Sequence, residues 1–415
     1  GSLAIQDVEF SFNFQDPQEK FQALNGKTFL LSQLSEEDRA LFNAASIILP
    51  SLDGTNGGQF DFTAMTSNLQ TLAGGADATN TINLRVKAND RWSSEEPSSY
   101  QIITTKPIFH VSAYPGNIWT KEFTMNSLLE EEVESGDYTK LSESMTYQFS
   151  TNGNDWTNFG DDLRKAELTP GTTYYIRGVY RGEIASTTTA IMTYPIIELK
   201  NGGVEGARIV RGSDDAGFFK PKDYGAQYEW DGWATLNALT AGYSWKTAYS
   251  FNSRSGTRPT DDKPAGSPGS AAARIITLAY GSGGTDTDPK YFTQSKLFLG
   301  TFTEEGAVKD YGIAYSSRPT ALHFFYKCVS NMNNDVSEVA IQLYGNGQLL
   351  GEGRFQTGAA SAYTGHMLPI EYKTNAEMVR LAPDKLSIVF RSGTKANLSK
   401  SDLKQFSYGV KNSQE

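Results

Sequence analysis

Apolar and polar residues alternate with a period of two over much of the chain, which is the pattern of β-strands that bury one face. EFSFNF (9–14), TINLRVKA (81–88) and VAIQLYG (339–345) show this alternation. The stretch SQLSEEDRALFNAA (32–45) departs from it and predicts one short helix with Ser35 as its N-cap. Strands therefore dominate the expected structure.

Turn signals separate these strands. Asn152-Gly153 and Asn346-Gly347 predict tight hairpins, and glycine-rich stretches at 53–58 and 73–77 end other strands. After residue 197 several strands follow one another with no helical crossover, which favours an antiparallel sandwich. The sequence predicts an all-β fold, with two immunoglobulin-like sandwiches followed by a jelly-roll β-sandwich. The predicted domains are 1–106, 107–196 and 197–415.

Composition adds few positive clues but excludes several kinds of function. The chain has 415 residues, more than one ordinary core can hold, so two or three domains are expected. A net charge of -10 leaves no basic face for phosphates, which excludes nucleic acid as a partner. The single cysteine, Cys328, cannot support a disulfide framework. Three histidines without an HExxH motif leave little material for a zinc site.

The stretch SSRPTALHFFYKC (316–328) has two chemically different faces. In a strand, one face would carry Leu322, Phe324, Tyr326 and Cys328, an ordinary core stripe. The opposite face would carry His323, Phe325 and Lys327. Two interpretations remain open for this second face, a loop packed over Phe325 or a surface that binds a ligand.

A first resemblance lies in ELTPGTTYYIRGVY (167–180). The Leu-x-Pro-Gly-Thr-x-Tyr spacing of residues 168–174 resembles the fibronectin type III pattern. That resemblance implies a sandwich over 107–196 in which Tyr174 closes a corner with its hydroxyl. Such modules usually serve as spacers or interaction platforms, so no chemistry is expected here.

A second resemblance covers much of the third segment. It is carried by WDGWATLNA (230–238), GSAAARI (269–275), SRPTAL (317–322) and LSIVF (386–390). In this order they resemble the Bacteroidetes carbohydrate metabolism domain family. The resemblance implies a jelly roll similar to carbohydrate-binding modules, in an exported, lipid-anchored protein of the outer-membrane surface or periplasm. The ending FSYGVKNSQE (406–415) departs from the acidic last strand expected of the family.

Two stretches are candidates for a structural Ca²⁺ site. NGGVEGAR (201–208) is similar to the opening of several sugar-binding jelly rolls, and this similarity implies Glu205 as a calcium ligand. GTDTDP (284–289) places Asp286 and Asp288 at alternate positions, as oxygen ligands of calcium often are.

A glycan site needs flat aromatic rings for the C–H faces of sugars and planar polar groups for their hydroxyls. The segment 224–251 is rich in aromatic residues and could supply both. The candidate ligand-binding residues are Trp230, Trp233, Trp245, Tyr243, Asn237, Asp231, His323, Phe325 and Lys327. The alternative is that these aromatic residues are core, as most are in large sandwiches.

These patterns favour an exported carbohydrate-binding or glycan-metabolism accessory protein whose jelly roll binds a glycan. One alternative is a glycoside hydrolase that uses a pair of carboxyl groups in the same domain. The other is a cell-surface adhesion or scaffold protein with no sugar site, whose partners are cell-surface proteins. This last alternative predicts that Trp230, Trp233 and Trp245 are all buried.

Overall fold

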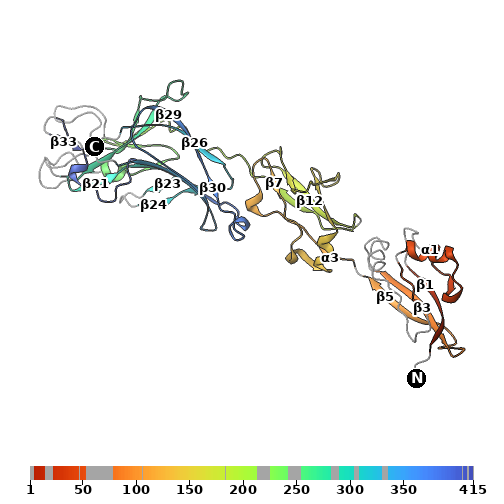
Figure 1. The fold of residues 1–415 in the computed structure, drawn as a ribbon. Coiled ribbons are helices and arrows are strands. Elements are labelled where there is room, and N and C mark those ends of the chain that lie inside the picture. Colours follow the sequence, from red (N-terminus) through yellow and green to blue (C-terminus); the bar gives the residue numbers. More distant parts are fainter. Residues whose placement is uncertain are drawn as a thin grey trace. The chain divides into compact units, whose positions relative to one another are not determined.

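The computed structural model describes residues 4–14, 22–45, 47–52, 78–104, 106–182, 184–212, 225–241, 254–281, 289–302, 308–329, 335–403, 405–408 and 411–414. Over these ranges the chain is nearly all β, with a few short helices, which confirms the predicted fold class (Figure 1). No helix within them is both long and apolar enough to cross a membrane.

The chain divides into two compact units. Unit 1 comprises Gly1–Ala113, Phe123–Ala166 and Thr173–Met192; unit 2 comprises Tyr114–Glu122, Glu167–Thr172 and Thr193–Glu415. No sheet in the described ranges crosses the predicted boundaries after 106 and 196. The predicted second domain, 107–196, is nevertheless divided between unit 1 and unit 2. The three-domain organisation therefore stays a prediction.

The first sheet of unit 1 contributes to a core rich in phenylalanines. Its strands are β1 (Ile5–Asn13), β2 (Thr28–Leu30), β3 (Ala78–Ala88), β4 (Arg91–Trp92) and β5 (Ser98–Thr104), in the order β2-β1-β3-β4 with β5 also on β3. The short helix η1 (Leu31–Gln33) leads to α1 (Glu36–Ala44), which buries Phe42 against Phe10, Phe12 and Phe29 at ring distances of 5.6, 5.9 and 5.0 Å. Ser35 and Asp38 form a reciprocal capping box, so the predicted helix start is confirmed.

The second sheet of unit 1 lies within the predicted fibronectin-like segment. Its strands are β9 (Met145–Ser150), β10 (Thr157–Asn158), β12 (Thr173–Tyr180), β13 (Ile184–Ala185) and β14 (Thr189–Met192). Smaller elements are β6 (Ile108–Phe109), β7 (Phe123–Thr124), β8 (Val133–Ser135), β11 (Arg164–Lys165), η3 (Glu130–Glu132) and α3 (Tyr138–Glu143). Tyr174 is buried and stacks on Phe149 at 5.5 Å, so it is a core residue of this sheet.

Unit 2 contains a seven-stranded antiparallel sheet. Its strands run in the order β17 (Ala234–Thr235), β22 (Lys296–Phe298), β31 (Lys385–Arg391), β27 (Ser337–Gly345), β28 (Gln348–Thr357) and β30 (Glu371–Tyr372), with β25 (Ile313–Ala314) also on β31. Asn346 and Gly347 join β27 to β28 with positive φ angles of 49° and 74°. This is the backbone of a type I′ turn, and it confirms the predicted hairpin.

Two-stranded sheets make up most of the rest of unit 2. They are β15 (Arg208–Arg211) with β16 (Gln227–Glu229), β18 (Thr257–Thr260) with β19 (Ala272–Ile275), β20 (Thr277–Tyr280) with β21 (Tyr291–Gln294), β23 (Gly300–Phe302) with β24 (Val308–Tyr311), β26 (Ala321–Cys328) with β29 (Ala360–Pro369), and β32 (Gln405–Tyr408) with β33 (Lys411–Gln414). The short helices are η2 (Pro115–Asn117), α4 (Asn237–Ala241), η4 (Met378–Arg380) and η5 (Lys400–Asp402).

Strand β26 packs face to face on the seven-stranded sheet. Phe324 lies 5.9 Å from Phe355 of β28 and 5.7 Å from Phe390 of β31, measured between ring centroids. Leu322 packs into the same core, which also holds Val339, Ile341 and other apolar residues of the seven-stranded sheet. The β26–β29 pair is thus one layer of a β-sandwich, and the predicted core stripe of β26 faces the other layer.

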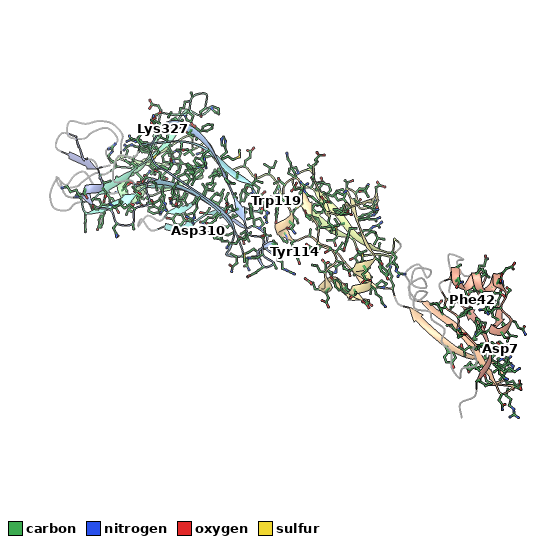
Figure 2. All side chains as sticks on the ribbon, viewed as in Figure 1. Asp7, Phe42, Tyr114, Trp119, Asp310 and Lys327 are labelled. Carbon is green, nitrogen blue, oxygen red and sulfur yellow. The ribbon has the colours of Figure 1, made fainter. Side chains whose placement is uncertain are left out.

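Arg318 lies just before β26 and is buried against two aromatic rings of unit 2 that contact each other edge to face. Its guanidinium carbon is 4.5 Å from the ring centroid of Trp119 and 4.1 Å from that of Tyr372 (Trp119 is labelled in Figure 2). Tyr372 donates a hydrogen bond from its hydroxyl to the carbonyl of Pro319 at 2.8 Å. Burial lowers the pKa of Arg318, while cation–π attraction stabilises its charge. This clamp fixes the chain where β26 begins.

Replacing Arg318 tests the clamp. Arg318→Ala removes both the cation–π contacts and the buried stem, so the free energy of unfolding should fall by about 2–4 kcal/mol. Arg318→Met keeps most of the side-chain volume, so its free energy of unfolding should fall by less than that of Arg318→Ala. Urea unfolding of the full chain, followed by tryptophan fluorescence, measures the difference. Wild-type stability in Arg318→Ala would show that the clamp does not hold this part of unit 2.

Candidate functional site

The outward surface of the β26–β29 pair is the best-formed candidate site. We define the β26–β29 face as His323, Phe325 and Lys327 of β26 with Tyr363 and Met367 of β29. The side chain of Phe325 is 56% exposed and that of Met367 is 67% exposed. The exposure of Phe325 does not fit a described loop packed over it, and the ligand-binding interpretation of this face stays a prediction.

Phe325 forms the centre of this face. His323 contacts it edge-on, with ring centroids 5.1 Å apart and an interplanar angle of 65°. Gly365 lies directly across from Phe325 on β29, and a Cβ at that position would come within 3.1 Å of the phenyl ring. Because Gly365 has no side chain, the Phe325 ring can lie over β29 at this point. More than half of Phe325 is still exposed to solvent.

Three polar groups meet at one end of the face. Lys327 Nζ lies 2.6 Å from the Oδ2 atom of Asp262, and the Tyr363 hydroxyl donates to the Asp262 carbonyl at 2.5 Å. The Lys327 ammonium also lies 5.9 Å from the Tyr363 ring centroid. The bond to Asp262 raises the pKa of Lys327, and burial raises the pKa of Tyr363. Figure 2 labels Lys327, which marks this end of the face.

Asp262 belongs to the loop between β18 and β19, and that loop is tied down elsewhere. Lys263 donates hydrogen bonds from its ammonium to the carbonyls of Ser267 and Gly269, inside the loop. At the far end, Ser270 donates to Glu205 Oε2 from its backbone N–H at 3.0 Å and from its hydroxyl at 2.6 Å. The position of Asp262 beside Lys327 is therefore set by the loop as a whole.

The predicted tryptophan platforms Trp230 and Trp233 are core residues. Their exposed fractions are 4% and 8%, and both rings belong to the core of unit 2. Each indole N–H is satisfied internally, that of Trp230 by the Val204 carbonyl at 3.1 Å and that of Trp233 by the Asn201 carbonyl at 2.8 Å. This corrects the sequence-based prediction for these two residues, because neither ring can stack on a ligand. Trp245 and Tyr243 lie outside the described residues.

Asn237 and Asp231 also have structural roles. Asn237 is buried, donates through Nδ2 to the carbonyls of Tyr228 and Thr257 at 2.7 Å each, and accepts from the Thr257 N–H at 2.9 Å. Its polar atoms are used inside the fold, which corrects the prediction that it binds a ligand. Asp231 is exposed and pairs with Lys200 at 2.8 Å, and this partner lowers the pKa of the carboxyl group.

The role of Glu205 as a calcium ligand stays a prediction, and the partners described for its carboxylate are hydrogen-bond donors of Ser270. The groups that surround its carboxylate are the hydroxyl and N–H donors of Ser270 and the positive charge of Lys263, all of which lower its pKa. Calcium takes about six to eight oxygen ligands, backbone carbonyls and waters among them. The described part of the chain contains no cluster of three or more His, Cys, Asp or Glu side chains suited to a metal. Asp286 and Asp288 lie outside the described residues.

Three members of the site were missed from the sequence: Asp262, Tyr363 and Met367. The alternation in ASAYTGHMLP (360–369) could have placed Tyr363 and Met367 on one face of a strand. Their position beside β26 could not be found this way, because the β27–β28 hairpin separates the two strands in the sequence.

Comparisons with known proteins leave the family open. No family model matches the chain, and no curated protein matches it. One similar solved chain comes from work described as "Structural basis for the promiscuous specificity of the carbohydrate-binding modules from the beta-sandwich super family". It has 10% sequence identity and a TM-score of 0.20, and the match covers 70% of this chain and 93% of that one. A TM-score this low does not establish a shared fold, so the site rests on its own geometry.

Trp233 offers a test of the core assignment. Trp233→Ala should lower the free energy of unfolding by about 3–5 kcal/mol, because it leaves a cavity and an unpaired Asn201 carbonyl. Trp233→Phe keeps most of the ring volume, so its free energy of unfolding should fall by less than that of Trp233→Ala. Urea unfolding of both variants measures this. Wild-type stability in Trp233→Ala would instead mean that the indole is a surface group.

The Glu205–Ser270 contact predicts a pH dependence. Because the folded pKa of Glu205 is lowered from its ordinary 4.5, its ionised form stabilises the fold above that pH and the contribution is lost as pH falls through the folded value. The melting temperature of wild type should therefore exceed that of Glu205→Gln at neutral pH, and the difference should shrink in acid. A difference that is constant with pH would contradict this role for the carboxylate.

Proposed function

We propose that the protein binds a glycan on the β26–β29 face. The observation that carries this proposal is Phe325, a residue 56% exposed to solvent, on the same face as the ordered polar group of Lys327, Asp262 and Tyr363. A sugar has an apolar C–H face and a rim of hydroxyls, and it needs both kinds of contact at once. Aromatic surface with a few placed polar groups is the general arrangement of a ligand site, and both parts of this one suit a sugar.

The apolar part of the face supplies affinity. Phe325 and Met367 expose apolar surface side by side with His323, and covering such surface is favourable by about 25 cal/mol per Å². The face is shaped in advance, because Gly365 sets the position of the ring and the β18–β19 loop sets the position of Asp262. Little ordering would then be required on binding, which preserves affinity.

Binding fits this face better than glycoside hydrolysis does. Hydrolysis uses two carboxyl groups, roughly 5–10 Å apart, one on each side of the scissile bond. At the polar end of the β26–β29 face the Asp262 carboxylate pairs with Lys327, and no described interaction brings a second carboxylate to it. We therefore propose a carbohydrate-binding accessory protein; export to the cell surface or periplasm is proposed from the family resemblance alone.

A scaffold protein without a sugar site is the second candidate. It predicts buried tryptophans, and Trp230 and Trp233 are buried. The exposed Phe325 and Met367 would then meet a cell-surface protein. The two candidates differ in whether the isolated protein recognises polysaccharides.

Phe325→Ala is the decisive variant for this proposal. Screening the full chain on a glycan array should give polysaccharide hits, and titration calorimetry should show that Phe325→Ala weakens each by about 10- to 100-fold, the value of one buried phenyl ring. Its melting temperature should stay near that of wild type, because the ring is largely exposed. Tyr100→Ala is the matched control, since Tyr100 is an aromatic of unit 1 with 55% exposure.

Two results would contradict glycan binding at this face. One is a wild-type protein that is folded but gives no hit on the array. The other is a set of hits that Phe325→Ala and Tyr100→Ala affect equally.

A further inference from the structure

The ion pair of Lys327 and Asp262 retains hydrogen-bond donors and an acceptor that no described residue uses, and these indicate a specific class of ligand. In the described structure, Asp262 uses Oδ2 for Lys327, and its Oδ1 atom accepts no hydrogen bond. Lys327 has three N–H donors and directs one of them to Asp262. The pair is partly open, with side-chain exposures of 30% for Lys327 and 56% for Asp262. A free acceptor and free donors thus lie side by side.

We infer that this pair selects neutral glycans with adjacent free hydroxyls and rejects glycans that carry carboxylates; the inference rests on the proposed function. Two neighbouring hydroxyls of one sugar can donate to Asp262 Oδ1 and accept from Lys327 Nζ while the ring stacks on Phe325. Charge-assisted hydrogen bonds of this kind are about twice as strong as neutral ones.

Charge explains the rejection of acidic glycans. Lys327 and Asp262 neutralise each other at 2.6 Å, so the polar end of the face has no uncompensated positive charge to attract an anion. A uronate carboxylate placed there would lie next to the Asp262 carboxylate, and like charges in contact are strongly unfavourable. The net charge of -10 on the whole chain acts in the same direction at longer range.

The pair is also held rigidly enough to discriminate. The Tyr363 hydroxyl donates to the Asp262 carbonyl at 2.5 Å, and the Asp262 N–H donates to the Thr260 hydroxyl at 3.2 Å. These bonds fix the backbone of Asp262 independently of its carboxylate. Replacing the carboxylate by an amide should therefore change the charge of the site and leave its shape intact.

The test uses matched pairs of polysaccharides, each neutral chain beside the same chain oxidised at C6 to a uronate. Calorimetry with whichever neutral polysaccharide binds wild type should show at least about tenfold weaker binding of its oxidised partner. Asp262→Asn should weaken the neutral partner by about tenfold and strengthen the oxidised one, because Lys327 is then an unpaired cation. The control is Asp261→Asn, which removes the same charge from the neighbouring exposed carboxylate.

The outcomes separate this inference from the proposed function. Equal wild-type affinity for the neutral and oxidised partners would overturn the inference while Phe325-dependent binding stands. The inference would also be overturned if Asp262→Asn and Asp261→Asn changed the selectivity equally. Net charge alone would then explain the preference for neutral glycans. Failure of all neutral polysaccharides to bind, or insensitivity to Phe325→Ala, would overturn glycan binding itself. Melting temperatures of both Asn variants confirm that they are folded.

Discussion

The candidate site depends on the strict alternation of side chains along β26. Leu322 and Phe324 pack into the sandwich core, and this packing forces His323, Phe325 and Lys327 to the outer surface. A shift of the strand by one residue would bury Lys327 and His323 and expose the core stripe, so the register is strongly specified. The Arg318 clamp supports that register, because Trp119 and Tyr372 hold the chain immediately before the strand.

The face draws on three segments that are distant in the sequence. β26 supplies the aromatic centre, β29 supplies Tyr363 and Met367, and the β18–β19 loop supplies Asp262. The loop contacts β26 and β29 at Asp262 and contacts Glu205 at Ser270. Local pairing thus builds a flat apolar surface, and a tethered loop adds polar groups to one end of it. Together these features give the face its amphipathic character.

Much of the local structure follows from the sequence, whereas the contents of the site follow only in part. The cap of α1 at Ser35, the Asn346-Gly347 turn and the two faces of β26 depend on neighbouring residues, and each was predicted correctly. Trp230 and Trp233 were wrongly placed on a binding surface, because composition shows that a segment is aromatic but not which side of it is buried. Asp262 and Met367 depend on long-range pairing, which one sequence does not reveal.

Contact between a glycan and the β26–β29 face can be measured directly at Met367. The chain contains seven methionines, and Met367 is 67% exposed and lies across from His323, which contacts Phe325. Methyl NMR of ¹³C-methyl-methionine protein, with the signal identified through Met367→Leu, would follow a titration with a polysaccharide that binds. If glycan binds here, the Met367 resonance should move and the resonances of methionines remote from this face should not. A Met367 signal that stays fixed while binding saturates would contradict it.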